Sequence, residues 1–401
     1  MTNEVVNVPE LRFTGFEDEW KKKKLDDVAN YRRGSFPQPY GNKEWYDEKN
    51  GEPFVQVVDV DKNMKLHDQT KQKISDLAKP KSVKGFKGDI VVTLQGSIGR
   101  VALLHYDAYI DRTLLLIYSF KIEMNKNYFK YVLYLLFLKE KERAPGGTIK
   151  TITKKVLSNF KIDIPNVGEQ EKIGEFFSKL DRQIELEEQK LAKLEEQKKG
   201  YMQKVFSQEL RFKDENGNDY DEWKEEKLEN IADFQNGKAH ENLVSIEGEY
   251  VLVNSKFIST DTRIKKHVSQ QLTPLNKEDI AIVMSDIPNG KALAKCFLVD
   301  ENNKYSLNQR IGRIYNILGD SRFLYLILNR NKQLLKYDSG VGQTNLKKSE
   351  ITDILLNWPI KEEQEKIGDF FSKLDEHINK QNQKIAGLKL RKQGFLQKMF
   401  V

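Results

Sequence analysis

Polar and basic side chains gather in short segments of both halves of the chain, most of which contain glycine. These segments are residues 32–35, 95–100 and 146–150 in the first half, and residues 236–238, 285–291, 308–310 and 342–347 in the second. Lysine and arginine bind phosphate oxygens, and arginine, asparagine and glutamine can each form two hydrogen bonds with a base edge. Glycine lets a backbone approach such a ligand closely. These residue types therefore favour nucleic-acid recognition.

The single candidates follow from these segments and from the arginines and lysines beside them. They are Arg32, Arg33, Ser35, Gln95, Ser97, Arg100, Arg112, Lys150 and Lys154 in the first half, and Lys238, Asn289, Lys291, Arg310, Gln343, Asn345 and Lys347 in the second. Each segment could instead be an ordinary turn with solvated polar residues. Arg112 and Arg310 close similar strand segments, so they could equally form structural ion pairs. The lysines of residues 79–87 fit either a phosphate-tracking surface or a flexible basic loop.

The sequence carries no motif for chemistry on a substrate. It has no Asn/Asp-Pro-Pro-Phe/Tyr segment that would present an amino group to a methyl donor, and no Gly-x-Gly-x-x-Gly or Gly-x-x-x-x-Gly-Lys-Ser/Thr phosphate loop. None of the five histidines has the spacing of a zinc site, and the single cysteine, Cys296, lies in an apolar run. We expect no catalytic residue, no bound metal and no cofactor in this chain.

Composition sets broad limits on the kind of protein. A net charge of +7 and an isoelectric point of about 8.9 suit a partner that carries phosphates, but so small a surplus does not require one. Charged residues make up 32% of the chain, and 21 phenylalanines and 16 tyrosines supply bulk for buried cores. The first residues lack an apolar signal core, and the longest apolar run is too short for a membrane span. We expect a cytoplasmic protein that does not contact membranes.

An internal repeat is the most informative feature of the sequence. Residues 164–206 align without a gap onto residues 358–400. The match centres on EQEKIG and FFSKLD, at residues 169–174 and 176–181, which recur at residues 363–368 and 370–375. A second match opens each half, because ELRF at residues 10–13 returns at residues 209–212, followed in both copies by Glu-Trp-Lys. Between these segments the halves diverge, so the frame is duplicated while the globular interiors differ.

The interiors have the pattern of an α+β fold. Short β-rich runs are predicted at residues 54–60, 89–94, 113–120, 250–253, 279–284 and 311–317, and helices at residues 126–141 and 321–335. Turn signals with Gly and Pro separate the runs. We place mixed α/β domains at residues 1–165 and 208–358, each followed by a helix, at residues 166–207 and 359–401.

The apolar residues of the two long helices follow a heptad pattern that two polar positions interrupt in each copy. The interruptions are Glu187 and Lys198 in the first helix, and Gln381 and Lys392 in the second. An antiparallel pairing can place Glu187 opposite Lys392 and Lys198 opposite Gln381, whereas a parallel pairing brings the two lysines together. We therefore predict one intramolecular antiparallel coiled coil with pseudo-two-fold symmetry. Two separate helices, each on its own domain, are the alternative.

Such an architecture would touch two separated short DNA sites. A helix over residues 169–206 would be about 57 Å long at about 1.5 Å per residue, and duplex DNA repeats about every 34 Å. The repeated EQEKIG and FFSKLD frame, the two dissimilar globular halves and the length resemble the specificity subunits of Type I restriction–modification enzymes. This resemblance covers the whole chain.

The resemblance implies a division of labour. Each globular half would be a target-recognition domain for one part of a split, asymmetric sequence in double-stranded DNA. The helices would set the unspecified spacer and dock two methyltransferase (modification) subunits, which restriction (endonuclease and translocase) subunits join. S-adenosylmethionine, ATP and Mg²⁺ would be used by those partners and not by this chain. The competing interpretation is a non-catalytic coiled-coil scaffold that does not read DNA specifically.

Overall fold

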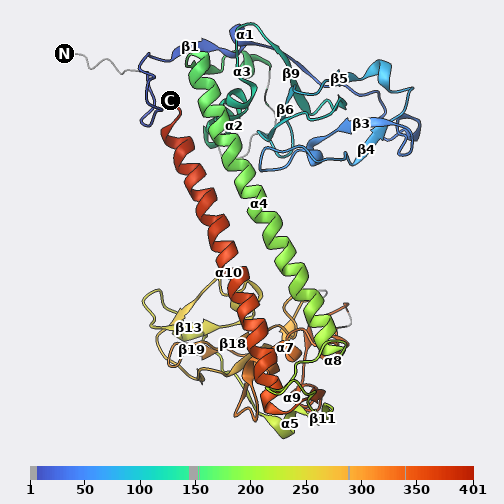
Figure 1. Ribbon diagram of the computed structural model, residues 1–401, viewed down its shortest axis with the longest axis vertical. Coiled ribbons are helices and arrows are strands. Elements are labelled where there is room, and N and C mark those ends of the chain that lie inside the picture. The colour runs from blue at the N-terminus through green and yellow to red at the C-terminus, as the bar shows by residue number, and fades with distance from the viewer. Residues whose placement is uncertain (1–6, 144–151, 153, 288–289, 339) are drawn as a thin grey trace, which may run out of the picture. The chain divides into compact units, whose positions relative to one another are not determined.

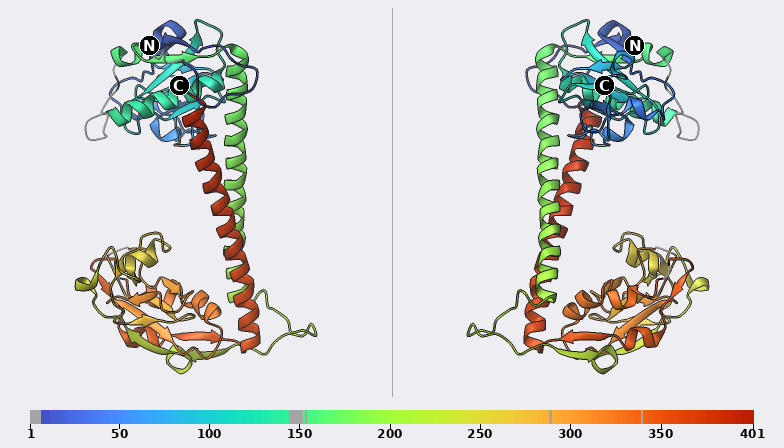
Figure 2. Two further views of the ribbon diagram at one scale, coloured as in Figure 1. Left: turned by 90° about the vertical axis from the view of Figure 1, so that its left-hand side faces the viewer. Right: turned by 90° about the vertical axis from the view of Figure 1, so that its right-hand side faces the viewer.

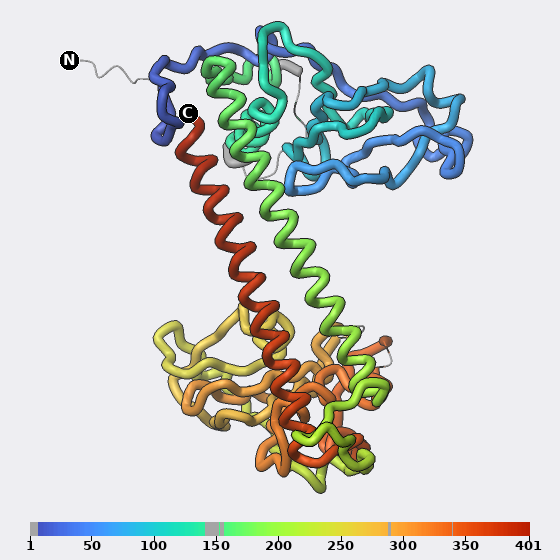
Figure 3. The backbone as a smooth tube through the Cα atoms, in the orientation of Figure 1, coloured from blue at the N-terminus to red at the C-terminus, as the bar shows by residue number. Residues whose placement is uncertain are grey.

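The computed structural model of this chain describes residues 7–143, 152, 154–287, 290–338 and 340–401 (Figure 1). The chain divides into two compact units. The first contains Met1–Gln189 together with Gln383–Val401, and the second contains Lys190–Asn382. Each unit thus contains a segment of both long helices, α4 (Val167–Phe206) and α10 (Lys361–Lys398), which are continuous in the chain trace (Figure 3).

Two four-stranded sheets form the globular part of the first unit. One has the strand order β2-β9-β6-β7 and is antiparallel, and the other has the order β4-β3-β8-β5 with β3 and β8 parallel. The strands are β2 (Ala29–Arg33), β3 (Glu52–Val55), β4 (Gln72–Ile74), β5 (Val83–Gly85), β6 (Ile90–Thr93), β7 (Val101–Leu103), β8 (Ala108–Ile110) and β9 (Leu114–Phe120). The first strand, β1 (Lys21–Lys24), pairs with the last, β10 (Lys161–Ile164), in a separate two-stranded antiparallel sheet.

The second unit repeats the topology of these three sheets, with β11 and β22 in the places of β1 and β10, and its described residues add a two-stranded sheet of β17 and β21. Its sheets have the orders β12-β20-β16-β18 and β14-β13-β19-β15, again with one parallel pair, β13 and β19. The strands are β11 (Lys224–Lys227), β12 (Asp233–Asn236), β13 (Tyr250–Val253), β14 (His267–Val268), β15 (Pro274–Leu275), β16 (Ile280–Val283), β17 (Ser285–Asp286), β18 (Cys296–Leu298), β19 (Tyr305–Leu307), β20 (Ile311–Tyr315), β21 (Thr344–Asn345) and β22 (Leu355–Trp358). The two interiors therefore share a backbone plan although their sequences diverge.

Short helices complete both units. In the first unit they are α1 (Leu25–Val28), α2 (Lys126–Arg143), α3 (Lys154–Ser158) and the 3-10 turns Lys43–Trp45, Val57–Asp59 and Lys79–Lys81. In the second they are α5 (Leu228–Ile231), α6 (Ser255–Ser259), α7 (Ser321–Leu328), α8 (Lys332–Leu335), α9 (Lys348–Thr352) and the 3-10 turn Glu241–Leu243.

Two of the predicted secondary-structure elements were wrong in part. The strand expected over residues 54–60 ends at Val55, and a 3-10 turn follows because the Asp59 carboxylate accepts the backbone N–H of Gln56 at 2.8 Å. The helix expected over residues 321–335 breaks into α7 and α8. Arg330 has a φ of 60°, and the Asn331 side chain caps α8 by accepting the N–H of Gln333 at 2.8 Å.

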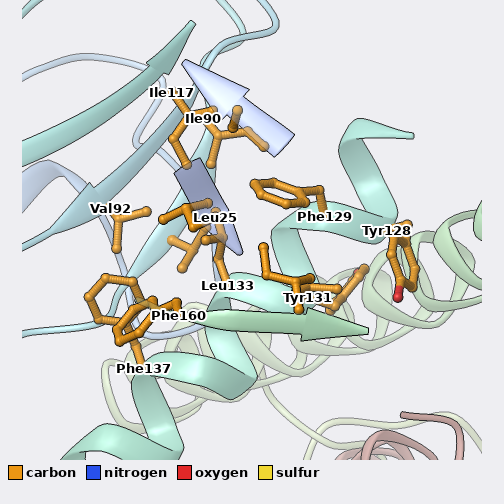
Figure 4. Packing of buried hydrophobic residues seen from close by; sticks show 14 of the residues in the cluster. Leu25, Ile90, Val92, Ile117, Tyr128, Phe129, Tyr131, Leu133, Phe137 and Phe160 are labelled. Atoms are coloured by element: carbon orange, nitrogen blue, oxygen red, sulfur yellow. The ribbon is translucent and has the colours of Figure 1, made fainter. Parts of the chain in front are cut away.

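Helix α2 covers one sheet of the first unit and forms its main core. Figure 4 shows Phe129, Leu133 and Phe137 of this helix facing Ile90, Val92 and Ile117 of the sheet, with Leu25 and Phe160 between them. All of these side chains are buried. Burying a large apolar side chain contributes about 1.5–3 kcal/mol, so this helix and sheet stabilise each other.

The repeated EQEKIG segments anchor each long helix to its own unit. Glu169 is fully buried and accepts hydrogen bonds from Arg12 at 2.7 and 2.8 Å and from the Trp20 indole at 3.1 Å. In the second unit the buried Glu363 accepts from Arg211 at 3.3 and 2.8 Å and from the Trp223 indole at 2.9 Å. In each half, therefore, the repeated opening segment and the repeated EQEKIG segment contact each other.

The glutamine and glycine of the same segments hold the next helix. Gln170 donates to Pro165 O at 3.0 Å and accepts the N–H of Asn125, just before α2, at 2.9 Å. A Cβ atom on Gly174 would lie 2.6 Å from Asn125 Oδ1, so only glycine fits there. Gln364 and Gly368 make the equivalent contacts before α7, with Asp320 in the place of Asn125.

Each long helix begins in one unit and ends in the other. Aromatic residues at its C-terminal end pack beside the start of the other long helix. The chain ends in the first unit, where the C label stands in Figure 2. There the ring of Phe400, just after α10, lies 6.3 Å from Trp20, 5.6 Å from Tyr128 and 5.8 Å from Phe177. In the second unit, Phe206 at the end of α4 lies 6.3 Å from Trp223, 5.9 Å from Phe323 and 6.3 Å from Phe371. Helices α4 and α10 therefore run antiparallel within each unit.

Ion pairs set the register of this coiled coil, but they differ from the predicted ones. Lys392 pairs with Asp181 at 2.5 Å, and Lys198 pairs with Asp375 at 2.5 Å. These contacts are equivalent, because each joins a heptad lysine to the aspartate of the FFSKLD segment in the other copy. The predicted pairing of Glu187 with Lys392 was wrong, since Glu187 pairs with Lys384 at 2.6 Å. The predicted pairing of Lys198 with Gln381 was also wrong, since Lys198 pairs with Asp375.

The prediction failed because it matched only the heptad positions with one another. Asp181 and Asp375 lie one residue beyond the apolar positions Leu180 and Leu374, beside the seam rather than in it. In the first unit the pair belongs to a larger cluster, where Tyr131 donates to Asp181 at 2.6 Å and Lys130 lies 3.7 Å from it. Burial lowers the pKa of the Lys130 ammonium, and the charge of Asp181 opposes that effect.

Replacing Arg12 with alanine should destabilise the first unit by about 3 kcal/mol, because it leaves the buried Glu169 carboxylate without its cation. Hydrogen exchange of residues 7–24 and 161–180 measures the loss. Lys22→Ala is the control, because its pair with Asp163 is exposed and should contribute less than about 1 kcal/mol. Equal effects of the two variants would contradict the anchoring role of Glu169.

Exchanging the charges of the second-unit pair tests the register. Lys198→Asp alone or Asp375→Lys alone places like charges together, whereas the double variant restores an opposite pair. We expect the double variant to unfold at a higher temperature than either single variant, by a difference worth up to about 1 kcal/mol because the pair is partly exposed. Additive effects of the two changes would show that these side chains do not interact.

Candidate nucleic-acid interface

Three loops of the first unit meet at one end of its antiparallel sheet, where β2 and β6 end and β9 begins. We call this end of the sheet the edge. Gly34 N donates to Leu114 O at 3.0 Å, and Ser35 N donates to Ile110 O at 3.0 Å, so the end of β2 lies on the turn between β8 and β9. Leu94 N donates to Thr113 O at 2.8 Å, which adds the loop after β6. The predicted candidates Ser35, Gln95 and Arg112 are therefore brought together although they are far apart in the sequence.

The side chain of Arg112 is exposed at this edge and lies over an aromatic ring. Its guanidinium is 5.4 Å from the centre of the Tyr40 ring. The Tyr40 hydroxyl donates to Asp111 and accepts from Gln56 Nε2 at 3.2 Å. An open cavity of about 450 Å³ lies here, and Tyr40, Gln56, Val58, Lys71, Arg112 and Thr113 are among its lining residues. This edge combines a hydrogen-bonded loop, an exposed arginine and room for a ligand.

Other candidates of the first unit are held by the protein itself. Arg100 donates to Val60 O at 2.9 Å, Arg33 donates to Ile152 O at 3.1 Å, and the Ser35 hydroxyl donates to Lys81 O at 3.0 Å. The backbone oxygen of Ser97 accepts from the Thr93 hydroxyl at 2.5 Å. These contacts give Arg100, Arg33 and Ser35 structural roles in the loops, whereas Arg32 is exposed and Gln95 half-buried.

The lysine-rich segment of residues 79–87 does not present all of its lysines as free cations. Lys79 pairs with Glu52 at 2.8 Å, and Lys84 pairs with the same carboxylate at 3.1 Å. The hydrogen bonds of Lys79 and Lys84 lower the pKa of Glu52. Two of its lysines thus share one carboxylate at the sheet β4-β3-β8-β5, which compensates part of their positive charge.

The second unit brings its candidates together in the same way. Gly237 N donates to Ile311 O at 3.0 Å, and Met284 N donates to Arg310 O at 3.0 Å. Leu346 N donates to Met284 O at 2.7 Å, and β17 pairs with β21, so that Asn345 lies opposite Ser285. The loops that carry Lys238, Arg310 and residues 343–345 therefore share one edge.

The side chains at this second edge divide into exposed and tethered groups. Lys238, Lys291, Arg310, Asn345 and Lys347 are exposed, whereas the Gln343 amide donates to the Ser285 hydroxyl at 2.7 Å. The loop that carries Lys291 is fixed from within, because Asp286 Oδ2 accepts the backbone N–H groups of Ala292 at 2.6 Å and Leu293 at 3.0 Å. The backbone N–H of Lys347 donates to Glu350 at 2.8 Å at the start of α9.

Three predicted residues lie where the structure says little. Lys150 and Asn289 fall outside the described residues. Lys154 begins helix α3, but its side chain is not described. Their assignment to DNA binding stays a prediction.

Sequence reasoning missed part of the first edge and misaligned the two halves. Tyr40 and Gln56 were not predicted, because each becomes a site residue only through the packing of the parallel strands β3 and β8. The backbone bonds make Thr113 equivalent to Arg310, so the counterpart of Arg112 is Gln309. Gln309 lies inside a predicted segment but was not singled out.

Histidine and acidic residues supply no metal site in the part of the chain that the structure describes, where no group of three or more His, Cys, Asp or Glu side chains could hold an ion. His240 is buried with both ring nitrogens engaged, one 2.7 Å from Lys238 O and the other 2.8 Å from the Ser306 hydroxyl. No helix in the described ranges is long and apolar enough to cross a bilayer.

Comparison with known proteins matches both units to one family. The model of the Type I restriction modification DNA specificity domain matches residues 17–196 and again residues 220–390. The chain belongs to this family. It contains two copies of the specificity domain, in agreement with the internal repeat and with the repeated sheet topology.

Relatives and solved structures agree with this membership. The specificity subunit of the Type I restriction enzyme MjaVIII of Methanocaldococcus jannaschii is 26% identical over 65% of this chain and 69% of its own length. The putative MjaX specificity subunit of the same organism is 32% identical over 31% of this chain and 29% of its own. The S subunit of a Type I system from M. genitalium has the same fold, with a TM-score of 0.62 and 18% identity over 98% of this chain and 99% of that one.

Replacing Gly34 with alanine should displace the Arg112 loop, because the new Cβ atom would lie 2.2 Å from Asp111 O. We expect weaker specific DNA binding by the complex that contains this chain, with the loss confined to the bases read by the first unit. Gly41→Ala is the matched control, since nothing lies within 4 Å of its Cβ position. Sequence preference can be measured by selection from random DNA, and unchanged preference in Gly34→Ala would contradict this position of the interface.

Proposed function

We propose that this specificity subunit reads a split, asymmetric sequence in double-stranded DNA, one part with each unit. The observation that carries this proposal is the repeated edge. Two sheets with the same topology present loops at the same place, but the exposed side chains at equivalent positions differ, as with Arg112 and Gln309. Identical edges would suit a palindrome, whereas different edges suit two unlike half-sites.

The long helices would set the distance between the two half-sites. Helix α4 has 40 residues and α10 has 38. At about 1.5 Å per residue a helix of this length spans nearly 60 Å, which is between one and two turns of duplex DNA. Because each helix is anchored at its start by a buried glutamate and closed at its end by a phenylalanine cluster, it can act as a ruler rather than a loose tether.

Catalysis would belong to partner subunits. Two methyltransferase (modification) subunits would dock on the helices and modify adenine with S-adenosylmethionine, and restriction subunits would use ATP and Mg²⁺. The solved structure of a related subunit, which has a TM-score of 0.57, comes from work on complex assembly of a Type I system. In this division of labour the present chain is a non-catalytic, cytoplasmic subunit that supplies sequence recognition.

Reconstitution tests the proposal directly. The chain is incubated with the modification subunit of its own system and S-adenosylmethionine, and methylated adenines are mapped by sequencing. We expect methylation at one split sequence with a fixed spacer, and none when this chain is omitted. Methylation without sequence preference, despite a stable complex, would instead identify a scaffold that joins the subunits without reading DNA.

A further inference from the structure

We propose that Arg112 and Gln309 are specificity-determining residues that occupy the same position in the two units, and that each reads one base of its own half-site. This inference rests on the proposed function and deepens it. The chemistry of the two side chains differs, so the bases that they select should differ as well.

The two positions are equivalent by three matched pairs of backbone hydrogen bonds. Gly34 N binds Leu114 O as Gly237 N binds Ile311 O, both at 3.0 Å. Leu94 N binds Thr113 O at 2.8 Å as Met284 N binds Arg310 O at 3.0 Å. Asp111 N binds Val55 O as Asn308 N binds Val253 O, both at 3.0 Å. Arg112 and Gln309 are the residues at the centre of these two bonded turns.

A glycine at the end of the preceding strand also packs closely against each turn. A Cβ atom at Gly34 would lie 2.2 Å from Asp111 O, and one at Gly237 would lie 2.0 Å from Asn308 O. The end of the preceding strand therefore packs directly against the backbone of each turn. Backbone hydrogen bonds on both sides of the turn and the packed glycine hold it in place. Such a turn can present one side chain at a defined position, which base recognition requires.

Each tip side chain is exposed but oriented by a residue from the segment that follows the glycine. In the first unit the Arg112 guanidinium lies 5.4 Å from the centre of the Tyr40 ring. In the second, the Gln309 amide donates to Glu241 Oε1 at 2.5 Å. Both side chains are thus oriented before DNA binds, and less conformational entropy is lost when they contact a base.

The chemistry of the two side chains assigns the bases. The arginine fork matches the two acceptors of guanine in the major groove, and the glutamine amide matches the donor and acceptor of adenine. We therefore assign guanine to Arg112 and adenine to Gln309. The cavity of about 450 Å³ beside Arg112, with Gln56, Val58 and Thr113 in its lining, gives room for a base edge.

Reciprocal substitutions in the reconstituted methylation complex test this assignment. Arg112→Gln should change the preferred base at one position of one half-site from guanine to adenine, and Gln309→Arg should change one position of the other half-site from adenine to guanine. Methylation of the original site should fall roughly 10-fold or more in each variant. Arg112→Lys should relax the choice at its position, because it keeps the charge but loses the fork.

Controls separate base reading from charge and folding. Lys49→Gln and Gln270→Arg make the same charge changes at exposed positions of the same two units and should leave every base preference unchanged. Melting temperatures should be unchanged in all variants, since the substituted side chains are exposed.

The outcomes distinguish the two levels of the proposal. If the unmodified complex has no split target, the proposed function fails. If it has one, but Arg112→Gln and Gln309→Arg alter no single base preference or weaken all sequences alike, the proposed function stands and the assignment of these two residues is overturned.

Discussion

The buried glutamate at the start of each long helix is the contact on which the rest of the molecule depends. Glu169 and Glu363 are fully buried, and each is compensated by one arginine and one tryptophan from the segment that opens its half. A buried carboxylate without such partners would cost several kcal/mol, so the opening segment and the helix can only fold together. This constraint fixes where the helix begins relative to its sheets.

From that point the same few residues position everything else. The neighbouring glutamine and glycine hold the start of α2 or α7, and that helix covers the sheet whose far loops form the candidate interface. The phenylalanine at the end of the other long helix packs on the same tryptophan. Each unit is therefore completed by residues from both copies of the repeat, and the antiparallel direction of α4 and α10 follows from this exchange.

The sequence allowed the frame to be predicted better than the interface. The duplicated segments and heptads were sufficient for the two long helices and their antiparallel pairing, since those depend on local periodicity. The register was not, because Asp181 and Asp375 pair from beside the seam and a heptad pattern does not include them. The candidate interface was likewise predicted only in part. Arg112 was visible as an exposed arginine, but its equivalence to Gln309 and its contact with Tyr40 exist only once the parallel strands pair.

The two halves of the chain are similar in some segments and different in others because substitutions differ in how much stability they remove. A frame residue such as Glu363 or Gly368 is buried against several partners, so most replacements leave an unpaired charge or a steric clash. A tip residue such as Gln309 is exposed on a turn that backbone bonds and a glycine hold in place, so its side chain can change without disturbing the fold. Two copies of one unit can therefore keep a common frame while the exposed turn positions, which we propose to read DNA, diverge without loss of stability.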